Sequence, residues 1–269
     1  MLVVLTTLAL MSSACLDDSP APKEPPSKEV LSAITDRGRL LAGYDDACWH
    51  ASDAVMLKKP KPDSFDRYIA RKADGGWVVA FGKLDEAKDR FLVAYEATQG
   101  KKPEDFTVKA FAPPRADGGF LRSAARSIDT ALNDFQGERR PYNVAVLPAE
   151  KGQFWVYIVP APTKVGVWPL GGDVRYQIST DGAKLVEKRQ MHKSIIENAA
   201  PPPKGNQQQV AGMHSHVLSD IPEDTDVFHV LSRKPAVPEM VVTKKFYYTV
   251  NVDGGIEYAG KSENLRKAK

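Results

Sequence analysis

Residues 210–229 read VAGMHSHVLSDIPEDTDVFH, a stretch that holds three of the chain's five histidines and four carboxylates. The residues just before His214 are apolar enough for a buried strand. Because side chains alternate across an extended backbone, His214 and His216 would project from the same face of that strand. Two imidazoles placed in this way could share one cation.

The second half of the stretch favours a helix over residues 222–231, with acidic residues in its first turn, where they complement the helix dipole. Such a helix would hold Asp226 near the end of the histidine strand. A His-x-His pair with one carboxylate suits zinc, with water in an open fourth position. The pattern therefore predicts His214, His216 and Asp226 as zinc ligands. His229, three residues from Asp226, is a candidate for a supporting contact.

A simpler interpretation stays open at this point. His214 and His216 could be two polar residues at the end of a strand, and Asp224 and Asp226 could be charges that begin a helix. Under that interpretation His229 is a half-buried helix residue, and the chain has no metal site.

The arrangement of His214-Ser215-His216, a polar loop and Asp226 at a helix start resembles the signature of JAMM (Jab/MPN) metalloproteins. The resemblance covers roughly residues 120–260. It implies a mixed β-sheet domain with flanking helices, in which the two histidines and the aspartate bind zinc. It also implies an upstream glutamate as general acid or base, and hydrolysis of peptide or isopeptide bonds.

The chain departs from the JAMM pattern at several positions. Val217 replaces the usual proline, Glu223 replaces the usual serine, and the spacing to Asp226 is one residue shorter. Glu138 lies a few residues before the place of the catalytic glutamate and is our candidate for that role, with Glu197 as the alternative. These departures keep a second function open, in which a non-catalytic envelope protein uses the same scaffold as a binding module.

The N-terminus begins with an apolar run of signal-peptide length, residues 2–11, too short for a lasting transmembrane helix. Small residues at 12–14 precede Cys15, which resembles a bacterial lipobox and predicts acylation of Cys15. Residues 16–28 are rich in proline and charge and are typical of a flexible tether. We therefore expect a lipid-anchored protein of the cell envelope, periplasmic or on the outer surface. The alternative is an ordinary secretory signal cleaved near Ala14.

The remaining sequence predicts an α+β protein with two units. Residues 29–114 favour a small unit in which a helix over 40–55 packs on antiparallel strands at 76–82, 90–95 and 105–111. Residues 115–260 would form the JAMM-like domain, with a helix near 121–135, hairpins formed by 142–147 with 153–159 and 173–178 with 184–189, and strands after 240. A disordered tail is expected over residues 261–269.

Three smaller predictions complete the analysis. Cys48 falls on the apolar stripe of the first helix and is expected to be a packed core thiol, which leaves it without a disulfide partner if Cys15 is acylated. His192 and Glu197 lie in a possible short helix for which a surface role is favoured. The 26 per cent of charged residues give a net charge of only +3 and are scattered, which argues against a nucleic-acid partner. A peptide or protein substrate is what the resemblance to JAMM proteins implies.

Overall fold

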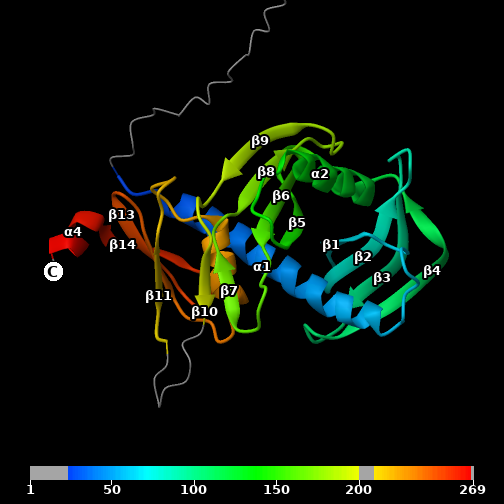
Figure 1. The fold of residues 1–269 in the computed structure, drawn as a ribbon, viewed down its shortest axis with the longest axis horizontal. Helices are drawn as coiled ribbons and strands as arrows, with labels where there is room; N and C mark the ends of the chain where they lie inside the picture. Colours follow the sequence, from blue (N-terminus) through cyan, green and yellow to red (C-terminus); the bar gives the residue numbers. More distant parts are fainter. Residues whose placement is uncertain (1–23, 200–208, 268–269) are drawn as a thin grey trace, which may run out of the picture.

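The computed structural model describes residues 24–199 and 209–267. The predicted signal peptide, Cys15, most of the predicted tether and residues 201–208 lie outside the described residues. Within the described part the protein has the predicted α+β architecture, with helices packed on antiparallel and mixed sheets (Figure 1). None of the helices in this part is long and apolar enough to cross a membrane.

Helix α1 (Lys28–Met56) runs through the molecule and contacts both of its ends (Figure 1). It begins twelve residues earlier than the helix predicted over 40–55, because the Ser27 hydroxyl caps it by accepting a hydrogen bond from the Val30 amide. Near this end Leu31 packs with Phe246 and Tyr248 of the C-terminal sheet. At Gly38 the helix passes close to helix α3 (Asp224–Ser232), where a Cβ would lie 2.4 Å from the Cβ of Val227.

The second half of α1 packs on a four-stranded antiparallel sheet with the order β1-β2-β3-β4. Its strands are β1 (Arg67–Ala73), β2 (Gly76–Leu84), β3 (Phe91–Gln99) and β4 (Phe106–Asp117). The last three confirm the predicted strands. The sequence pattern missed β1, in which only Ile69 and Ala70 are buried. Cys48 is buried in this core, as predicted, and forms no disulfide within the described residues.

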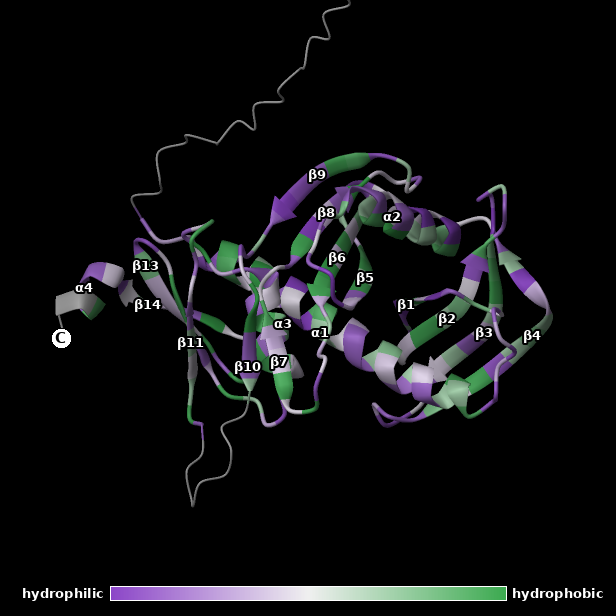
Figure 2. Ribbon diagram, viewed as in Figure 1, coloured by the Kyte–Doolittle hydropathy of each residue, from purple (hydrophilic) through white to green (hydrophobic). Residues whose placement is uncertain are grey.

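A second antiparallel sheet, in the order β5-β6-β8-β9, carries helix α2 (Phe120–Asp134). The strands are β5 (Tyr142–Pro148), β6 (Phe154–Pro160), β8 (Val174–Ile178) and β9 (Leu185–Gln190), and a 3-10 turn (Glu150–Gly152) links the first two. Both predicted hairpins are confirmed. Figure 2 shows that β5 and β6 are largely hydrophobic, in keeping with their central place in the core.

The C-terminal part holds a mixed sheet with the order β11-β12-β13-β14, in which β11 and β12 are parallel. Its strands are β11 (Gly212–Ser215), β12 (Glu239–Val242), β13 (Phe246–Val250) and β14 (Ile256–Lys261). Helix α3 (Asp224–Ser232) connects β11 to β12 and packs on α1. A separate ribbon pairs β7 (Val167–Leu170) with β10 (Ile196–Ala199).

The structure differs from the predicted division of the chain in two ways. One continuous apolar core joins α1 and β1–β3 to α2, β5, β6 and β8, so it crosses the boundary predicted near residue 114. In the predicted tail, Ser262–Lys267 form helix α4, since Ser262 is buried and its hydroxyl donates to the Thr243 carbonyl. Both differences come from contacts between segments that are distant in sequence.

A buried candidate metal centre

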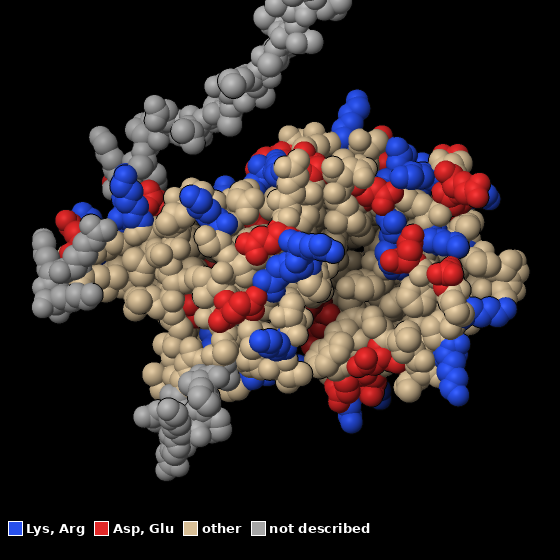
Figure 3. Space-filling view, viewed as in Figure 1, with Lys and Arg blue, Asp and Glu red and all other residues tan. Residues whose placement is uncertain are grey.

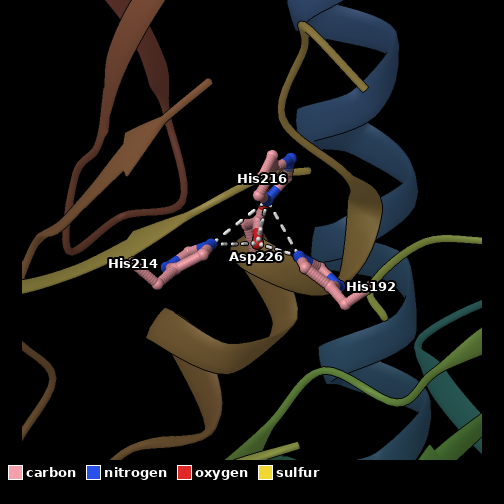
Figure 4. Close-up of side chains that lie close together, drawn as sticks. All are labelled: His192, His214, His216 and Asp226. Carbon is pink, nitrogen blue, oxygen red and sulfur yellow. Dashed lines mark hydrogen bonds and ion pairs between the residues drawn. The ribbon is translucent and has the colours of Figure 1, made fainter. Parts of the chain in front are cut away.

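Two of the predicted ligands come from the end of β11. His214 lies within the strand, opposite Val241 of β12, and His216 follows directly after it, with its amide bonded to the Val242 carbonyl at 2.8 Å. The extended backbone places both imidazoles on one face, and their Nε2 atoms lie 3.1 Å apart. The alternation predicted from the sequence is therefore confirmed in the geometry (Figure 4).

The third predicted ligand, Asp226, is held by the start of α3. Its Oδ2 accepts a hydrogen bond from the Glu223 amide at 2.7 Å, and the Glu223 side chain accepts in turn from the amide of Asp226, which together form a capping box. The other carboxylate oxygen, Oδ1, faces the histidines. The Asp226 side chain thus caps the start of the helix and also directs a carboxylate oxygen to the cluster.

The fourth member of the cluster is His192, from the segment after β9. Its Nε2 lies 2.8 Å from His216 Nε2 and 3.1 Å from Asp226 Oδ1. The surface role favoured from the sequence is wrong, because His192 is 7% exposed and lies in no helix. The predicted β8–β9 hairpin held the signal for this position. The register of this hairpin places Asp173 beside residues 190–192, and hence within reach of a hydrogen bond with His192.

The three histidine Nε2 atoms and Asp226 Oδ1 lie close enough together to share one ion. Asp226 Oδ1 lies 3.0 Å from His214 Nε2 and 3.4 Å from His216 Nε2. All four atoms lie within 4.8 Å of one another, and these four residues are the members of the group within the described part of the chain. With zinc–nitrogen bonds of about 2.05 Å, neighbouring ligands of a tetrahedron are about 3.3 Å apart. The four side chains could therefore hold one metal ion.

Each histidine is oriented by a partner on its other ring nitrogen. The Nδ1 of His192 lies 2.8 Å from Asp173 Oδ1, and that of His214 lies 3.0 Å from Glu239 Oε1. The Nδ1 of His216 lies 3.0 Å from the Ile221 carbonyl. When Nδ1 donates its proton to these acceptors, every Nε2 presents a lone pair to the centre. This is the outer arrangement that metal-binding histidines commonly have.

The charges of the cluster support one another strongly. Burial alone would lower the pKa of His192, but the carboxylates of Asp173 and Asp226 hold it well above its ordinary value. Burial would also lower the pKa of His214, but Asp226 and Glu239 raise it to about 9. Burial would raise the pKa of Asp226, yet the three histidines keep it well below its usual range. Asp226 is therefore a charged carboxylate, and it faces imidazoles that either are protonated or can bind a cation.

A glycine makes room for the contact between Glu239 and His214. A Cβ on Gly212 would lie 1.8 Å from Glu239 Oε2, so a larger residue at this position would have to displace the carboxylate. The same oxygen of Glu239 receives Arg233 Nη1 at 3.3 Å. Gly212, Arg233 and Glu239 together fix the orientation of His214.

The neighbouring acids of α3 have their own cationic partners. Asp224 is paired with Arg37 at 3.0 Å and Arg175 at 2.5 Å, and Glu223 is held by two hydrogen bonds from Arg189. These paired carboxylates are unavailable as ligands. The alternative in which Asp224 is a charge at the helix start holds for that residue, whereas Asp226 also faces the cluster.

The cluster forms part of the wall of a cavity of about 170 Å³. His192, His214 and His216 contribute to this wall, together with segments at the ends of β7, β9 and β11. Although the histidines are buried, the centre therefore has one side from which a small molecule could approach.

The other predicted site residues lie apart from the cluster. Glu138 is exposed and lines an adjacent cavity of about 430 Å³ that shares Lys193 with the first. Glu197 lies on β10 and forms an ion pair with Arg140 at 2.6 Å. His229 is 2% exposed and bonds through Nε2 to the Asn198 side chain, which ties α3 to β10. Burial and the nearby Arg233 lower the pKa of His229 to about 3, so it is a neutral structural contact.

Comparisons of the chain with models of known protein families, with curated proteins and with solved structures found no match.

Proposed function

We propose that the protein is a metal-dependent hydrolase of the peptidase or isopeptidase type, with zinc held by His192, His214, His216 and Asp226. One observation carries this proposal. Three imidazoles, each fixed at Nδ1 by a separate acceptor, direct their Nε2 atoms at a charged carboxylate beside a cavity. The resemblance of the motif to JAMM proteins supports the same type of reaction.

Electrostatics explain why this arrangement calls for a cation. Nitrogen lone pairs and a carboxylate oxygen that meet at about 3 Å in a buried site repel one another unless protons or a metal ion lie between them. Imidazole and carboxylate ligands suit zinc, and the absence of cysteine from the group disfavours softer ions. A divalent ion would satisfy all four ligands at once.

The residues of the chain would divide the chemical work as follows. The four ligands position the ion, whose contribution is to activate water and polarise a carbonyl group. Water would add to the amide carbon, the C–N bond would break, and the amine would leave with a proton. Within the described residues no further carboxylate joins the cluster. Glu138, which the sequence predicts for the proton-transfer role, lies in the adjacent cavity, so the proposal leaves water activation to the metal and its four ligands.

The proposal includes the location of the protein. The lipobox-like residues before Cys15 support attachment to a membrane by lipid, and hence a place in the cell envelope. A hydrolase anchored there would meet peptide or protein substrates outside the cytoplasm.

A second candidate function is supported by the number of ligands. Zinc sites that only stabilise a fold have four protein ligands, whereas catalytic zinc sites usually have three and an open position. With His192 the cluster supplies four. In this second candidate the metal is structural and the scaffold acts as a non-catalytic binding module.

The experiment that tests the proposal measures metal content and hydrolysis on the same preparations. The purified chain, without a polyhistidine tag, is compared with His214→Ala and with His50→Ala, a control histidine on α1 outside the cluster. We expect about one zinc per chain in the unmodified protein and the control, and almost none in His214→Ala. Cleavage of a peptide library, read by mass spectrometry, should follow the zinc content.

Two results would contradict the proposal. Folded protein that binds no zinc would exclude the metal centre itself. Stoichiometric zinc with four protein ligands by X-ray absorption, no water ligand and no cleavage of any peptide would favour the structural centre instead.

A further inference from the structure

The cavity beside the metal cluster has an unusual set of polar groups. Apart from the three histidines, the charged and hydroxyl-bearing residues that line it are Lys193, Ser194 and Ser215, and no acidic residue is among them. Ser215 alternates with His214 and His216 along β11, so it contributes its backbone rather than its hydroxyl group. The other contributors are apolar residues and a glycine. The wall therefore offers hydrogen-bond donors and one positive charge.

These three side chains are uncommitted within the described part of the chain. The ammonium group of Lys193 and the hydroxyls of Ser194 and Ser215 make no hydrogen bond or ion pair there, and all three residues are exposed. The situation of Arg175 and Arg189 close by is different, since both are engaged by carboxylates of α3. Lys193 is thus a cation at the cavity that is free to bind a ligand.

The backbone fixes the position of Lys193 next to the metal ligand His192. The carbonyl oxygen of His192 accepts a hydrogen bond from Gln190 Nε2 at 2.7 Å. Two residues on, the chain packs closely on Gly171, where a Cβ would lie 2.2 Å from the Ser194 carbonyl oxygen. Gly171 has a φ of +88°, a conformation that favours glycine. Lys193 therefore sits on a constrained segment between the two cavities.

We propose that this cavity binds an oxyanion group of the ligand, a carboxylate or a phosphate, with Lys193 as the residue that determines this specificity. Ser194 supplies a further hydrogen bond to it. The inference rests on the proposed metal centre and deepens it by naming the chemical class of the substrate. A volume of about 170 Å³ fits a single small group rather than a folded partner.

The residues of the two cavities indicate how such a ligand would be oriented. Lys193 lines both cavities, but the acidic Glu138 lines only the second. An anionic group is attracted to the first cavity by Lys193 and the metal ion and is disfavoured near Glu138. The neutral or cationic remainder of the ligand would extend into the second cavity.

The test uses the zinc-loaded full chain and three probes of similar size: acetate, inorganic phosphate and neutral acetamide. Binding is measured by calorimetry for the unmodified protein, Lys193→Gln, Lys193→Arg and Lys184→Gln, a control at an exposed lysine outside the cavity. We expect Lys193→Gln to weaken binding of the anion about tenfold or more. Lys193→Arg and Lys184→Gln should stay close to the unmodified protein, acetamide should bind far more weakly, and zinc content should be equal throughout.

The outcomes separate this inference from the function on which it rests. Tighter binding of acetate would identify a carboxylate ligand, and tighter binding of phosphate would identify a phosphate. Equal binding in Lys193→Gln and the unmodified protein, or no anion binding by zinc-loaded protein, would overturn the inference alone. Protein that holds no zinc would overturn both.

Discussion

The two ends of the molecule are stabilised by different interactions. The part formed by the second half of α1, β1–β4, α2 and the β5–β9 sheet shares one large apolar core. In the C-terminal part, the apolar clusters under α3 and the β11–β14 sheet are small, and buried charged residues surround them. A metal ion would therefore contribute most to the stability of the C-terminal part. The ion would connect β11, α3 and the segment after β9, where apolar packing is sparse.

The face seen in Figure 3 carries acidic and basic side chains intermixed, without a large patch of one sign. Strong electrostatic interactions also occur inside the protein. They lie in the cluster and in the ion pairs that connect α3 to α1, β8 and β9. The following predictions test how far the apolar and the charged parts depend on each other.

The largest effect should come from removing the metal. With free zinc at 1,000 times its dissociation constant, binding adds about 4 kcal/mol to the free energy of unfolding. A chelator should remove this contribution from the unmodified protein. Denaturant unfolding with and without zinc measures it, and His214→Ala provides the control because it should not respond to zinc. Equal responses of both proteins would show that the cluster is not the binding site.

A substitution in the apolar core should lower the stability of the protein without changing its zinc binding. Phe81 is 1% exposed in β2, and Phe81→Ala should lower the free energy of unfolding by about 3–5 kcal/mol through lost burial and the cavity it leaves. Zinc content of the folded protein should not change. Loss of zinc binding in a variant that remains folded would mean that the two parts are coupled more tightly than their separate clusters suggest.

Gly212→Ala should weaken the metal site without touching a ligand. The new methyl group would collide with Glu239 Oε2 and displace it from His214, so the dissociation constant for zinc should rise about 10- to 100-fold. Competition with a chromophoric chelator measures the constant. Gly118→Ala serves as the control, since its nearest atom would be 3.8 Å away. An unchanged constant in Gly212→Ala would remove Glu239 from the support of the site.

Asp45 tests the charged residues on the apolar side of the molecule. Burial and the nearby Asp46 raise its pKa to about 6, although a hydrogen bond from Asn143 opposes the shift. Between about pH 4 and pH 6 the native state therefore holds a proton that the unfolded chain has lost, so stability falls as pH rises through this window. At pH 7, Asp45→Asn should raise the free energy of unfolding by about 3 kcal/mol.

Near pH 4 this gain should almost vanish, because the carboxyl group is then protonated in the native state. Denaturant unfolding at the two pH values measures the difference, and Asp53→Asn, at an exposed position of the same helix, is the control. A gain that is the same at both pH values would point to a cause other than ionisation of Asp45.

Local patterns in the sequence predicted much of this structure and part of its site. Alternation along a strand placed His214 and His216 on one face, and acidic residues at a helix start placed Asp226 near them. The predicted pairing of β8 with β9 brings His192 beside Asp173, but its place in the cluster could not be predicted, because only tertiary packing brings it to β11. The contact of α1 with the C-terminal sheet also joins segments that are distant in sequence, so local patterns could not predict it.

The smallest effect is expected from Glu138→Gln, which tests whether the charged centre works as an enzyme in the way the resemblance implies. Glu138 is exposed, and it lies with Lys193 in the cavity next to the cluster rather than among the four ligands. Zinc content should be unchanged, and any hydrolysis should change less than about twofold. Removal of a general base instead costs about 10²–10⁴-fold in rate.

Rates for Glu138→Gln and for Glu197→Gln, whose side chain is already paired with Arg140, decide between these cases. A 100-fold loss in Glu138→Gln alone, with full zinc content, would assign the proton transfer to Glu138 after all. It would mean that the side chain approaches the metal when substrate fills both cavities. Equal small effects in both variants would leave water activation to the metal and its four ligands, and the C-terminal charges would then serve mainly to hold that ion in place.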